Sequence, residues 1–225
     1  MDIFLDLTGT LTDMESEDYA MLKLGEKIKS RFSLDMDAEE ILRRIEEYRK
    51  PYMDKRHISY TPIRFLVLEA VRRIVPKRLC ANDSYWIIDE YSSIHAKYVK
   101  LAPNALEGLK ILRKIARHMG LITDADRPFT DKLLSSLKIV DFFDSVTTAE
   151  DVGTGKPNPR IFQEAMKKGK SNIRIYIGDS EKRDISGAKN VGMIAIKIGG
   201  DSRLADYVAK DLMDAARFIQ TLETG

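Results

Sequence analysis

The spacing of apolar residues along the chain changes near residue 100. From about residue 16 to residue 100, apolar positions recur every three or four residues, which is the period of amphipathic helices. After residue 101, short apolar runs of strand length alternate with helical stretches. Strands that alternate with helices predict right-handed crossovers and a parallel sheet covered on both faces. The pattern therefore predicts an α/β protein with a doubly wound parallel sheet.

Four helices are predicted in the first part of the chain. An imperfect apolar stripe over residues 19–32 marks the first helix. Asp37 has the spacing of a capping box ahead of the second helix, and we expect Pro51 to stop that helix. Thr61-Pro62 offers a cap and a first helical residue for the third, and the fourth starts near residue 82. Four helices with short loops predict a helical subdomain.

The second part of the chain alternates strands and helices. The predicted strands cover residues 3–6, 120–123, 145–148, 173–177 and 193–198. The predicted helices cover residues 106–119, 130–137, 159–168, 184–191 and 211–222. The opening strand must join the same sheet as the later strands. We therefore expect the helical residues 14–100 to be inserted into a core domain made of residues 1–13 and 101–225.

Charge and composition narrow the classes of partner. The chain has 37 basic and 35 acidic residues and a formal charge of +2, which is too balanced to indicate nucleic acid. Basic residues gather between Arg49 and Arg78, either as a solvated helical face or as a positive rim that attracts an anionic substrate. The single cysteine, Cys80, excludes an internal disulfide, and no run reaches the roughly 18 apolar residues of a membrane span. We expect a soluble cytoplasmic protein, monomeric or homodimeric, that binds no membrane.

Four polar clusters follow predicted strands. In open α/β sheets, ligands bind beyond the carboxyl ends of the strands, where the strand order reverses. Any one of these clusters is also what an ordinary turn contains, so the signal is their combination in this order. The clusters are DLTGT at residues 6–10, Thr123-Asp124, GKP at residues 155–157 and GDSEKRD at residues 178–184.

The clusters have the residue types that phosphoryl transfer needs. A carboxylate can attack phosphorus if a cation neutralises the charge of the two anions, and Mg²⁺ prefers carboxylate and carbonyl oxygens. Asp6 and Asp179 can supply two such oxygens, with the Thr8 main-chain carbonyl as a third. Asp184 suits a role behind the metal or through water, and Lys156 can pair with the phosphoryl oxygens.

Hydrogen-bond donors complete the predicted site. The Thr123 hydroxyl and the amides of residues 7–9 can donate to the remaining phosphoryl oxygens. Gly9 allows the backbone a close approach to phosphate. The sequence thus predicts a phosphoryl-transfer site built around Asp6.

These motifs resemble those of the haloacid dehalogenase-like (HAD) superfamily across nearly the whole chain. The four motifs of that superfamily are matched by FLDLTGTL at residues 4–11, Thr123, Lys156 within GKPNP, and residues 178–184. The resemblance implies a Rossmann-like core, a helical cap at about residues 14–100, Asp6 as nucleophile and Mg²⁺ as cofactor. Most members are phosphatases that act on small phosphorylated metabolites.

Thr8 departs from the pattern of the family. Its phosphatases usually have a second aspartate here, which protonates the leaving group and activates the water that releases phosphate. A threonine hydroxyl cannot do this at neutral pH, and loss of a general acid-base group removes about 10²- to 10⁴-fold of rate. The metal site survives, because this position offers its main-chain carbonyl. We therefore expect a phosphatase that is slow or restricted in its substrates.

Other branches of the superfamily also lack this aspartate. Haloacid dehalogenases need no metal and typically replace the Gly-Asp that this chain keeps as Gly178-Asp179. Phosphonate-cleaving members use a cap lysine, and the sequence singles out none. P-type ATPases have a first motif very close to residues 6–12, but they are membrane pumps. The alternatives left open are a catalytically weak phosphate-binding or regulatory protein and, behind it, a phosphonatase or a dehalogenase.

Further residues are candidates for supporting roles. Two histidines, His95 and His118, fall in helical patterns and are interpreted as structural or exposed residues, not as ligands. Three aspartates could replace the missing proton donor, although each also suits a helix cap or a turn: Asp13, Asp124 and Asp126. Four residues near the loop before the third predicted helix could contact substrate from the cap: Arg56, His57, Tyr60 and Arg64.

Overall fold

Parallel pairing joins the strands into one sheet. The computed structural model describes residues 1–224, and within them six parallel strands pair in the order β3-β2-β1-β4-β5-β6. The strands are β1 (Asp2–Leu5), β2 (His118–Thr123), β3 (Ser145–Thr148), β4 (Arg174–Gly178), β5 (Ile194–Ile198) and β6 (Tyr207–Ala209). The predicted doubly wound sheet is confirmed. The edge strand β6 was missed, because three residues give no apolar run of strand length.

Helices cover both faces of the sheet. Ile3 and Leu5 point from β1 into one apolar core together with residues of α5 and α10, whereas Phe4 points into a second core with residues of α8 and α9. These alternating directions follow from the period of two along a strand. The helices of this part are α5 (Ala105–Ile115), α6 (Arg127–Ser136), α7 (Ala149–Val152), α8 (Pro159–Met166), α9 (Ser186–Asn190) and α10 (Leu212–Thr224). Residue 225 lies outside the described residues.

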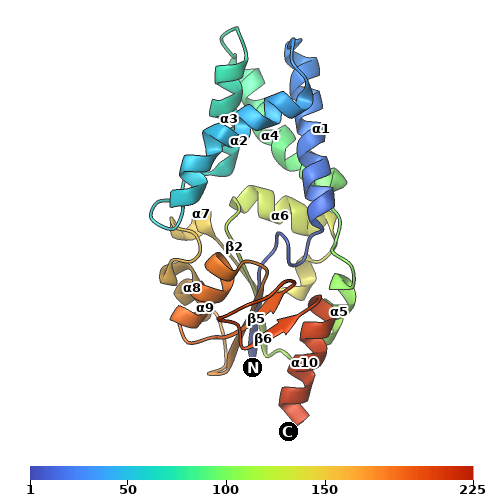
Figure 1. Ribbon diagram of the computed structural model, residues 1–225, viewed down its shortest axis with the longest axis vertical. Helices are drawn as coiled ribbons and strands as arrows, with labels where there is room; N and C mark the ends of the chain where they lie inside the picture. Colours follow the sequence, from blue (N-terminus) through green and yellow to red (C-terminus); the bar gives the residue numbers. More distant parts are fainter. Residues whose placement is uncertain (225) are drawn as a thin grey trace.

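The first four helices after β1 form a separate layer. Within residues 14–98 they are α1 (Met14–Phe32), α2 (Ala38–Lys55), α3 (Ile63–Ile74) and α4 (Ala81–Tyr98). We call these four helices the helical insert. Figure 1 shows the insert at one end of the molecule and both chain termini at the other. No helix of residues 1–224 is both long and apolar enough to cross a membrane.

The two connections to the insert run side by side. Thr12 pairs with Leu101 in an antiparallel bridge, and the Asp13 amide donates to the Lys100 carbonyl at 3.0 Å. The Lys100 amide in turn donates to the Ser16 hydroxyl at 3.0 Å. The insert therefore leaves and rejoins the sheet at one narrow junction, next to the end of β1.

Two helix boundaries differ from the prediction. Helix α2 continues through Pro51 to Lys55, although a proline inside a helix costs about 3 kcal/mol. Tyr48 and Met53, on the two sides of the proline, both pack against the apolar core, and this packing offsets the lost backbone hydrogen bond. Helix α5 ends at Ile115 and β2 begins at His118, so His118 lies in a buried strand and not in a helix.

The N-terminus of α3 is capped from the sheet side of the molecule. Thr61 was expected to cap this helix, but the helix starts at Ile63 without a local side-chain cap. Asp126, ahead of α6, instead accepts from the Ile63 amide at 2.7 Å and the Arg64 amide at 2.9 Å, and it also accepts from the Tyr60 hydroxyl. Its side chain is fully buried. A carboxylate at this end also complements the helix dipole.

Replacing Asp126 by alanine is expected to lower the free energy of unfolding by about 3 to 5 kcal/mol. The change leaves the Ile63 and Arg64 amides and the Tyr60 hydroxyl without their acceptor, while the Arg64 guanidinium keeps Glu150. Urea denaturation measures the loss. Asp131→Ala is the matched control, since Asp131 is an exposed carboxylate of the same helix, and it should cost less than about 0.5 kcal/mol. Equal losses in the two variants would contradict this role for Asp126.

Candidate active site

Asp6 and Asp179 lie side by side because of the strand order. β1 pairs with β2 on one side and with β4 on the other, so the chain changes direction across the sheet at β1. Asp6 follows β1, and Asp179 follows β4 directly after Gly178. The Asp6 amide donates to the Ile177 carbonyl at 2.9 Å, which fixes the register of the two strand ends. The two carboxylates therefore meet where ligands bind in open α/β sheets.

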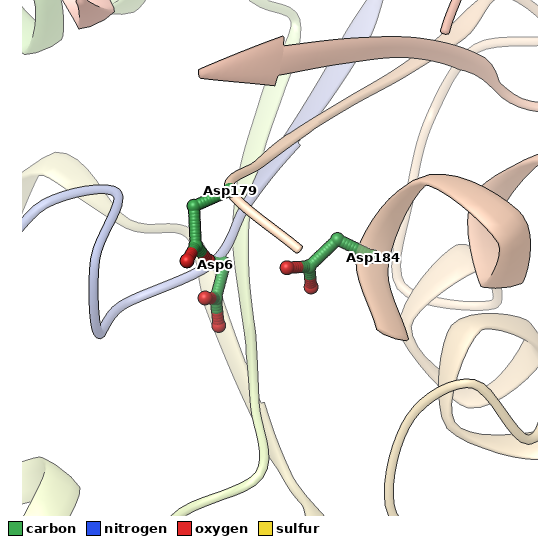
Figure 2. A group of neighbouring side chains, drawn as sticks. All are labelled: Asp6, Asp179 and Asp184. Carbon is green, nitrogen blue, oxygen red and sulfur yellow. The ribbon is translucent and has the colours of Figure 1, made fainter. Parts of the chain in front are cut away.

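A single lysine joins two of the carboxylates at this edge. Lys156 Nζ donates to Asp6 Oδ1 and to Asp184 Oδ1, each at 2.6 Å. The side chains of Lys156 and Asp184 are 1% and 0% exposed, so this charge network is shielded from bulk water. Figure 2 shows Asp184 pointing across toward the neighbouring Asp6 and Asp179. The sequence analysis assigned Lys156 to the phosphoryl oxygens, and in the structure Lys156 bonds these two aspartates.

Tyr176 completes the network from the middle of β4. Its hydroxyl accepts from Lys156 Nζ at 3.1 Å and donates to Asp184 Oδ1 at 2.8 Å. The Ser180 amide donates to the second oxygen, Asp184 Oδ2, at 2.9 Å. Sequence reasoning missed Tyr176, although a lone hydroxyl inside the apolar run IYIG indicates a buried polar partner.

The crowded carboxylates change their own proton affinities. Burial raises the pKa of Asp6 to about 7, a rise that Lys156 opposes and that Asp184 and Asp179 increase. Burial and the charge of Asp184 also raise the pKa of Asp179. Burial alone would raise the pKa of Asp184 as well, but the Lys156 ammonium overcomes this and lowers it. The site therefore holds more negative charge than one lysine balances.

The carboxylates fit a divalent cation. Oxygens of Asp6, Asp179 and Asp184 lie within 4.8 Å of one another. Asp179 Oδ1 is buried and has no hydrogen-bond partner among the described residues, which is costly for a charged oxygen unless a cation binds it. The donor set is made of oxygens only, which suits a hard cation such as Mg²⁺.

Gly9 is required by the close approach of the first turn to Asp179. Its φ is +81°, and a Cβ built on it would lie 2.7 Å from Asp179 Oδ2. From the sequence, we expected Gly9 to let the backbone come close to phosphate. The structure shows that Gly9 also makes room for the Asp179 side chain. Thr8 pairs with Thr12 across the same turn, and the Thr123 hydroxyl accepts from the Ala125 amide at 3.2 Å.

A cavity of about 390 Å³ lies between these residues and the helical insert. The sheet side of its lining includes Asp6, Thr8, Thr123, Asp124 and Lys156. The insert contributes Met14, Met21, Met53, Ile63 and Tyr91, together with the polar residues Glu17, Asp18, Glu46, Arg49, Arg56 and His95. The structure thus brings the predicted catalytic residues Asp6, Thr8, Thr123 and Lys156 to one wall of a mixed polar and apolar chamber.

Of the four predicted substrate contacts from the insert, only Arg56 lines this cavity. Its guanidinium lies 3.4 Å from Asp124 Oδ2, which Arg183 also approaches to 3.7 Å. Tyr60 and Arg64 instead bond Asp126, and the His57 carbonyl accepts from Thr154 at 2.8 Å. These three residues fasten the insert to the sheet domain.

The sequence analysis missed Glu17 as a cavity residue, and it named Arg49 only as part of the basic stretch that could attract an anionic substrate. Arg49 follows Ile41 and Ile45 at helical spacing, and its Nε is buried without a hydrogen-bond partner among the described residues. Glu17 precedes Leu24 and Ile28 on the buried face of α1 in the same way. In both helices, a charged residue stands in line with the apolar residues of the buried face. This pattern could have indicated from the sequence that the residue faces the interior.

His95 lines the cavity as a buried, neutral ring. Burial lowers the pKa of His95 to about 4. Its Nδ1 lies 2.6 Å from the Tyr91 carbonyl, so Nδ1 carries the ring proton and Nε2 is an acceptor. Phe129 packs against the ring with centroids 5.0 Å apart. The interpretation of His95 as a structural residue agrees with this burial.

The buried His95 is expected to make the fold less stable as pH falls. The unfolded chain binds a proton at a pKa of about 6.5 and the folded chain at about 4, so stability is lost as pH drops through this range. Between pH 7 and pH 5 the loss is about 2 kcal/mol. His95→Phe keeps a ring in this place and should abolish this part of the dependence. Urea denaturation at both pH values measures it, and an unchanged pH dependence in the variant would contradict it.

Comparisons with known proteins agree with the motifs. The family model described as haloacid dehalogenase-like hydrolase matches residues 3–198. A glyceraldehyde 3-phosphate phosphatase of Pyrococcus furiosus is 32% identical, with 93% of this chain and 89% of the relative covered. A HAD phosphatase from Thermococcus onnurineus superposes with a TM-score of 0.73 at 22% identity, with 97% of each chain covered. A Bacillus subtilis HAD-hydrolase bound to magnesium has a TM-score of 0.77 at 15% identity, with 97% of this chain and 98% of that chain covered.

The match spans 196 residues, from β1 through β5, and includes every strand end that carries a site residue. The resemblance inferred from the four motifs is thereby confirmed, and so is the expectation of a hydrolase. The chain belongs to the haloacid dehalogenase-like hydrolase family.

Proposed function

We propose that this hydrolase is a phosphatase of a small phosphorylated metabolite and that Asp6 is its nucleophile. The observation that carries the proposal is the position of Asp6 at the base of the cavity, bonded to Lys156 and crowded by two further carboxylates. The carboxylates and the phosphate are all negatively charged. A carboxylate can therefore attack the phosphate only if a cation balances this negative charge. The Pyrococcus furiosus relative, named a glyceraldehyde 3-phosphate phosphatase, supports the same reaction.

The cavity favours a short, polar substrate. Its volume of about 390 Å³ is near the lower end of the range for small-molecule sites, about 300 to 1,000 Å³. Arg49 and Arg56 face it from the insert and suit the hydroxyl or carbonyl oxygens beyond the phosphate. We therefore propose triose phosphates, with glyceraldehyde 3-phosphate as the first compound to test. Residues 14–100 would then act as a cap that excludes water from the phosphate.

The cation fits the predicted ligand set. Asp6, the Thr8 main-chain carbonyl and Asp179 would hold Mg²⁺, and Asp184 would support it from behind. When bound, Mg²⁺ would neutralise charge on the carboxylate and on the phosphate as they approach. The magnesium-bound Bacillus subtilis hydrolase of the same fold supports this assignment.

The residues of the chain then divide the work of the first step. Asp6 attacks phosphorus in line with the departing oxygen and carries the phosphoryl group as an acyl phosphate. Lys156 shifts from the carboxylates toward the phosphoryl oxygens. There its positive charge stabilises the negative charge that develops in the transition state. Tyr176 and the Ser180 amide hold Asp184 in place during this change. The Thr123 hydroxyl and the amides of residues 7–9 are the proposed donors to the remaining oxygens.

We expect Thr8 to limit the rate of this reaction. It can bind but cannot exchange protons at neutral pH, so turnover is slow or restricted unless another group supplies the proton. The competing proposal is a phosphate-binding protein without turnover, which the retained pair of Asp6 and Lys156 disfavours. The retained Gly178-Asp179 disfavours a dehalogenase, and a phosphonatase would need a cap lysine in the cavity, whose lining holds Lys156 of the sheet domain instead.

Asp6→Asn is expected to reduce phosphate release from glyceraldehyde 3-phosphate by at least about 10⁴-fold, because an amide cannot form the acyl phosphate. Phosphate release in the presence of Mg²⁺ measures the effect. Asp201→Asn removes an exposed carboxylate outside the site and should leave the rate unchanged. Equal activity in Asp6→Asn and the wild type would exclude this mechanism.

Mg²⁺ is expected to raise the melting temperature of the chelator-treated protein, because a cation that binds only the folded state stabilises it. Asp179→Asn should abolish this shift. The same variant should be at least as stable as the wild type in chelator, since it removes one of three crowded carboxylates. A magnesium shift that persists in Asp179→Asn would contradict the assigned ligands.

A further inference from the structure

The residue at position 8 leaves the proposed reaction without a proton donor. An alkoxide leaving group needs a proton as its bond to phosphorus breaks, and the water that later attacks must lose one. Both protons have to pass through a side chain that lines the cavity. The three aspartates considered from the sequence can therefore be tested against their contacts.

Asp13 and Asp126 do not belong to the described lining of the cavity, and each of the three aspartates accepts from a backbone amide. Asp13 Oδ2 accepts from the Ser16 amide at 2.9 Å and caps α1. Asp124 Oδ1 accepts from the Lys156 amide at 2.7 Å, and its Oδ2 faces two arginines. Both oxygens of Asp126 bond the N-terminus of α3.

Glu17 is the buried carboxyl group that lines the cavity from the insert. It lies in the first turn of α1, and its side chain is 11% exposed. The other insert carboxylates of the described cavity lining, Asp18 and Glu46, are exposed to solvent. Glu17 caps no helix, and its contacts hold one oxygen only.

Thr12 fixes Glu17 beside the turn that carries Thr8. The Thr12 hydroxyl donates to Glu17 Oε1 at 2.8 Å, and the Thr12 backbone pairs with Thr8 in the bridge across the first turn. Position 8 and the Glu17 carboxyl group are therefore separated by one threonine. Because Thr12 also pairs with Leu101 at the junction of the insert, this anchor belongs to the sheet side of the site.

The second oxygen of Glu17, Oε2, makes no hydrogen bond with the described residues and is available for proton transfer. Glu17 Oε2 lies 3.9 Å from His95 Nε2, which is too long for a hydrogen bond. His95 is neutral and its Nε2 has no proton to give, so it does not hold Glu17 as an anion. Burial raises the pKa of Glu17, with Asp18 and Asp13 adding to the rise and the bond from Thr12 opposing it. The carboxyl group can thus carry a proton and can also release it.

We propose that Glu17 is the general acid and base of this site, in place of the aspartate that the chain lacks at position 8. In the first step, an Asp6 oxygen bonds to phosphorus, the bond from phosphorus to the leaving oxygen breaks, and Glu17 Oε2 gives its proton to that oxygen. In the second step, the Glu17 carboxylate takes a proton from water while the water oxygen bonds to phosphorus. The acyl phosphate bond breaks, its electron pair returns to Asp6, and phosphate and a protonated Glu17 remain.

The proposal rests on the phosphatase function proposed above, and substrates that differ in their leaving group separate the two. Glyceraldehyde 3-phosphate releases an alkoxide, which needs a proton, whereas p-nitrophenyl phosphate releases a stable phenolate, which does not. Glu17→Gln should lower kcat/KM for glyceraldehyde 3-phosphate by about 10²- to 10⁴-fold and that for p-nitrophenyl phosphate by less than about tenfold. Glu15→Gln, an exposed residue of the same helical turn, is the matched control and should change neither value.

The second step gives an independent readout. Without its base, the Glu17→Gln enzyme should release one p-nitrophenolate per active site in a rapid burst and then slow down, because the acyl phosphate on Asp6 accumulates. Thr8→Asp in the Glu17→Gln background should restore part of the activity toward glyceraldehyde 3-phosphate. Thr12→Val keeps Glu17 but removes its anchor, and it should cause a smaller loss with the same preference for the phenolate substrate.

The possible results separate the two proposals. Equal losses on both substrates in Glu17→Gln, with no burst, would show a structural role and overturn the assignment of Glu17. Wild-type rates on both substrates in this variant would overturn it as well. If the wild type released phosphate from neither substrate in the presence of Mg²⁺, the phosphatase function itself would fail, and the role of Glu17 with it.

Discussion

The crowding of three carboxylates around one buried ammonium group is the constraint on which the rest of the structure depends. Asp6, Asp179 and Asp184 converge within 4.8 Å, and Lys156 bonds two of them. Burial, reinforced by the neighbouring carboxylates, raises the pKa of Asp6 to about 7. Such an arrangement is unfavourable in an empty site and becomes favourable when a cation binds. The unfavourable free energy of these crowded carboxylates thus indicates that the site binds a cation.

The fold supplies the rigidity that this crowding requires. Asp6 and Asp179 follow adjacent strands at the point where the sheet changes direction, so neither can withdraw from the other. Two glycines make room for the carboxylates. A Cβ on Gly9 would lie 2.7 Å from Asp179 Oδ2, and one on Gly178 would lie 2.5 Å from the Asp184 Cβ. Asp126 then fastens the helical insert over this edge and encloses the cavity.

Much of this arrangement could be predicted from the sequence, because it depends on local patterns. The change in apolar spacing near residue 100 gave the parallel sheet and the helical segment, and the polar residues after each strand gave Asp6, Thr123, Lys156 and Asp179. The same local patterns failed where distant residues decide. Helix α2 continues through Pro51 because apolar residues on both sides of it are buried. Helix α3 is capped by Asp126, which lies 63 residues further along the chain.

The residues that face the site from the insert could not be predicted for the same reason. Arg49 and Glu17 continue the apolar stripes of their helices, and only the packed structure shows that these stripes turn toward a cavity. In contrast, Tyr60 and Arg64 were expected to contact substrate because of their loop position, and they bond the sheet domain instead. Burial and hydrogen-bond partners distinguish the residues that line the cavity from those that join the insert to the sheet. Neither property can be read from the sequence.

The central claim is that Asp6 accepts a phosphoryl group while Lys156 leaves the carboxylates to meet it. A crystal structure of the protein with Mg²⁺ and beryllofluoride tests this most directly, because beryllofluoride on a carboxylate mimics an acyl phosphate. The account predicts beryllofluoride attached to Asp6, with Lys156 within hydrogen-bond distance of a fluorine and Mg²⁺ between Asp6 and Asp179. Beryllofluoride absent from Asp6 at saturating concentration, or attached to another carboxylate, would contradict it.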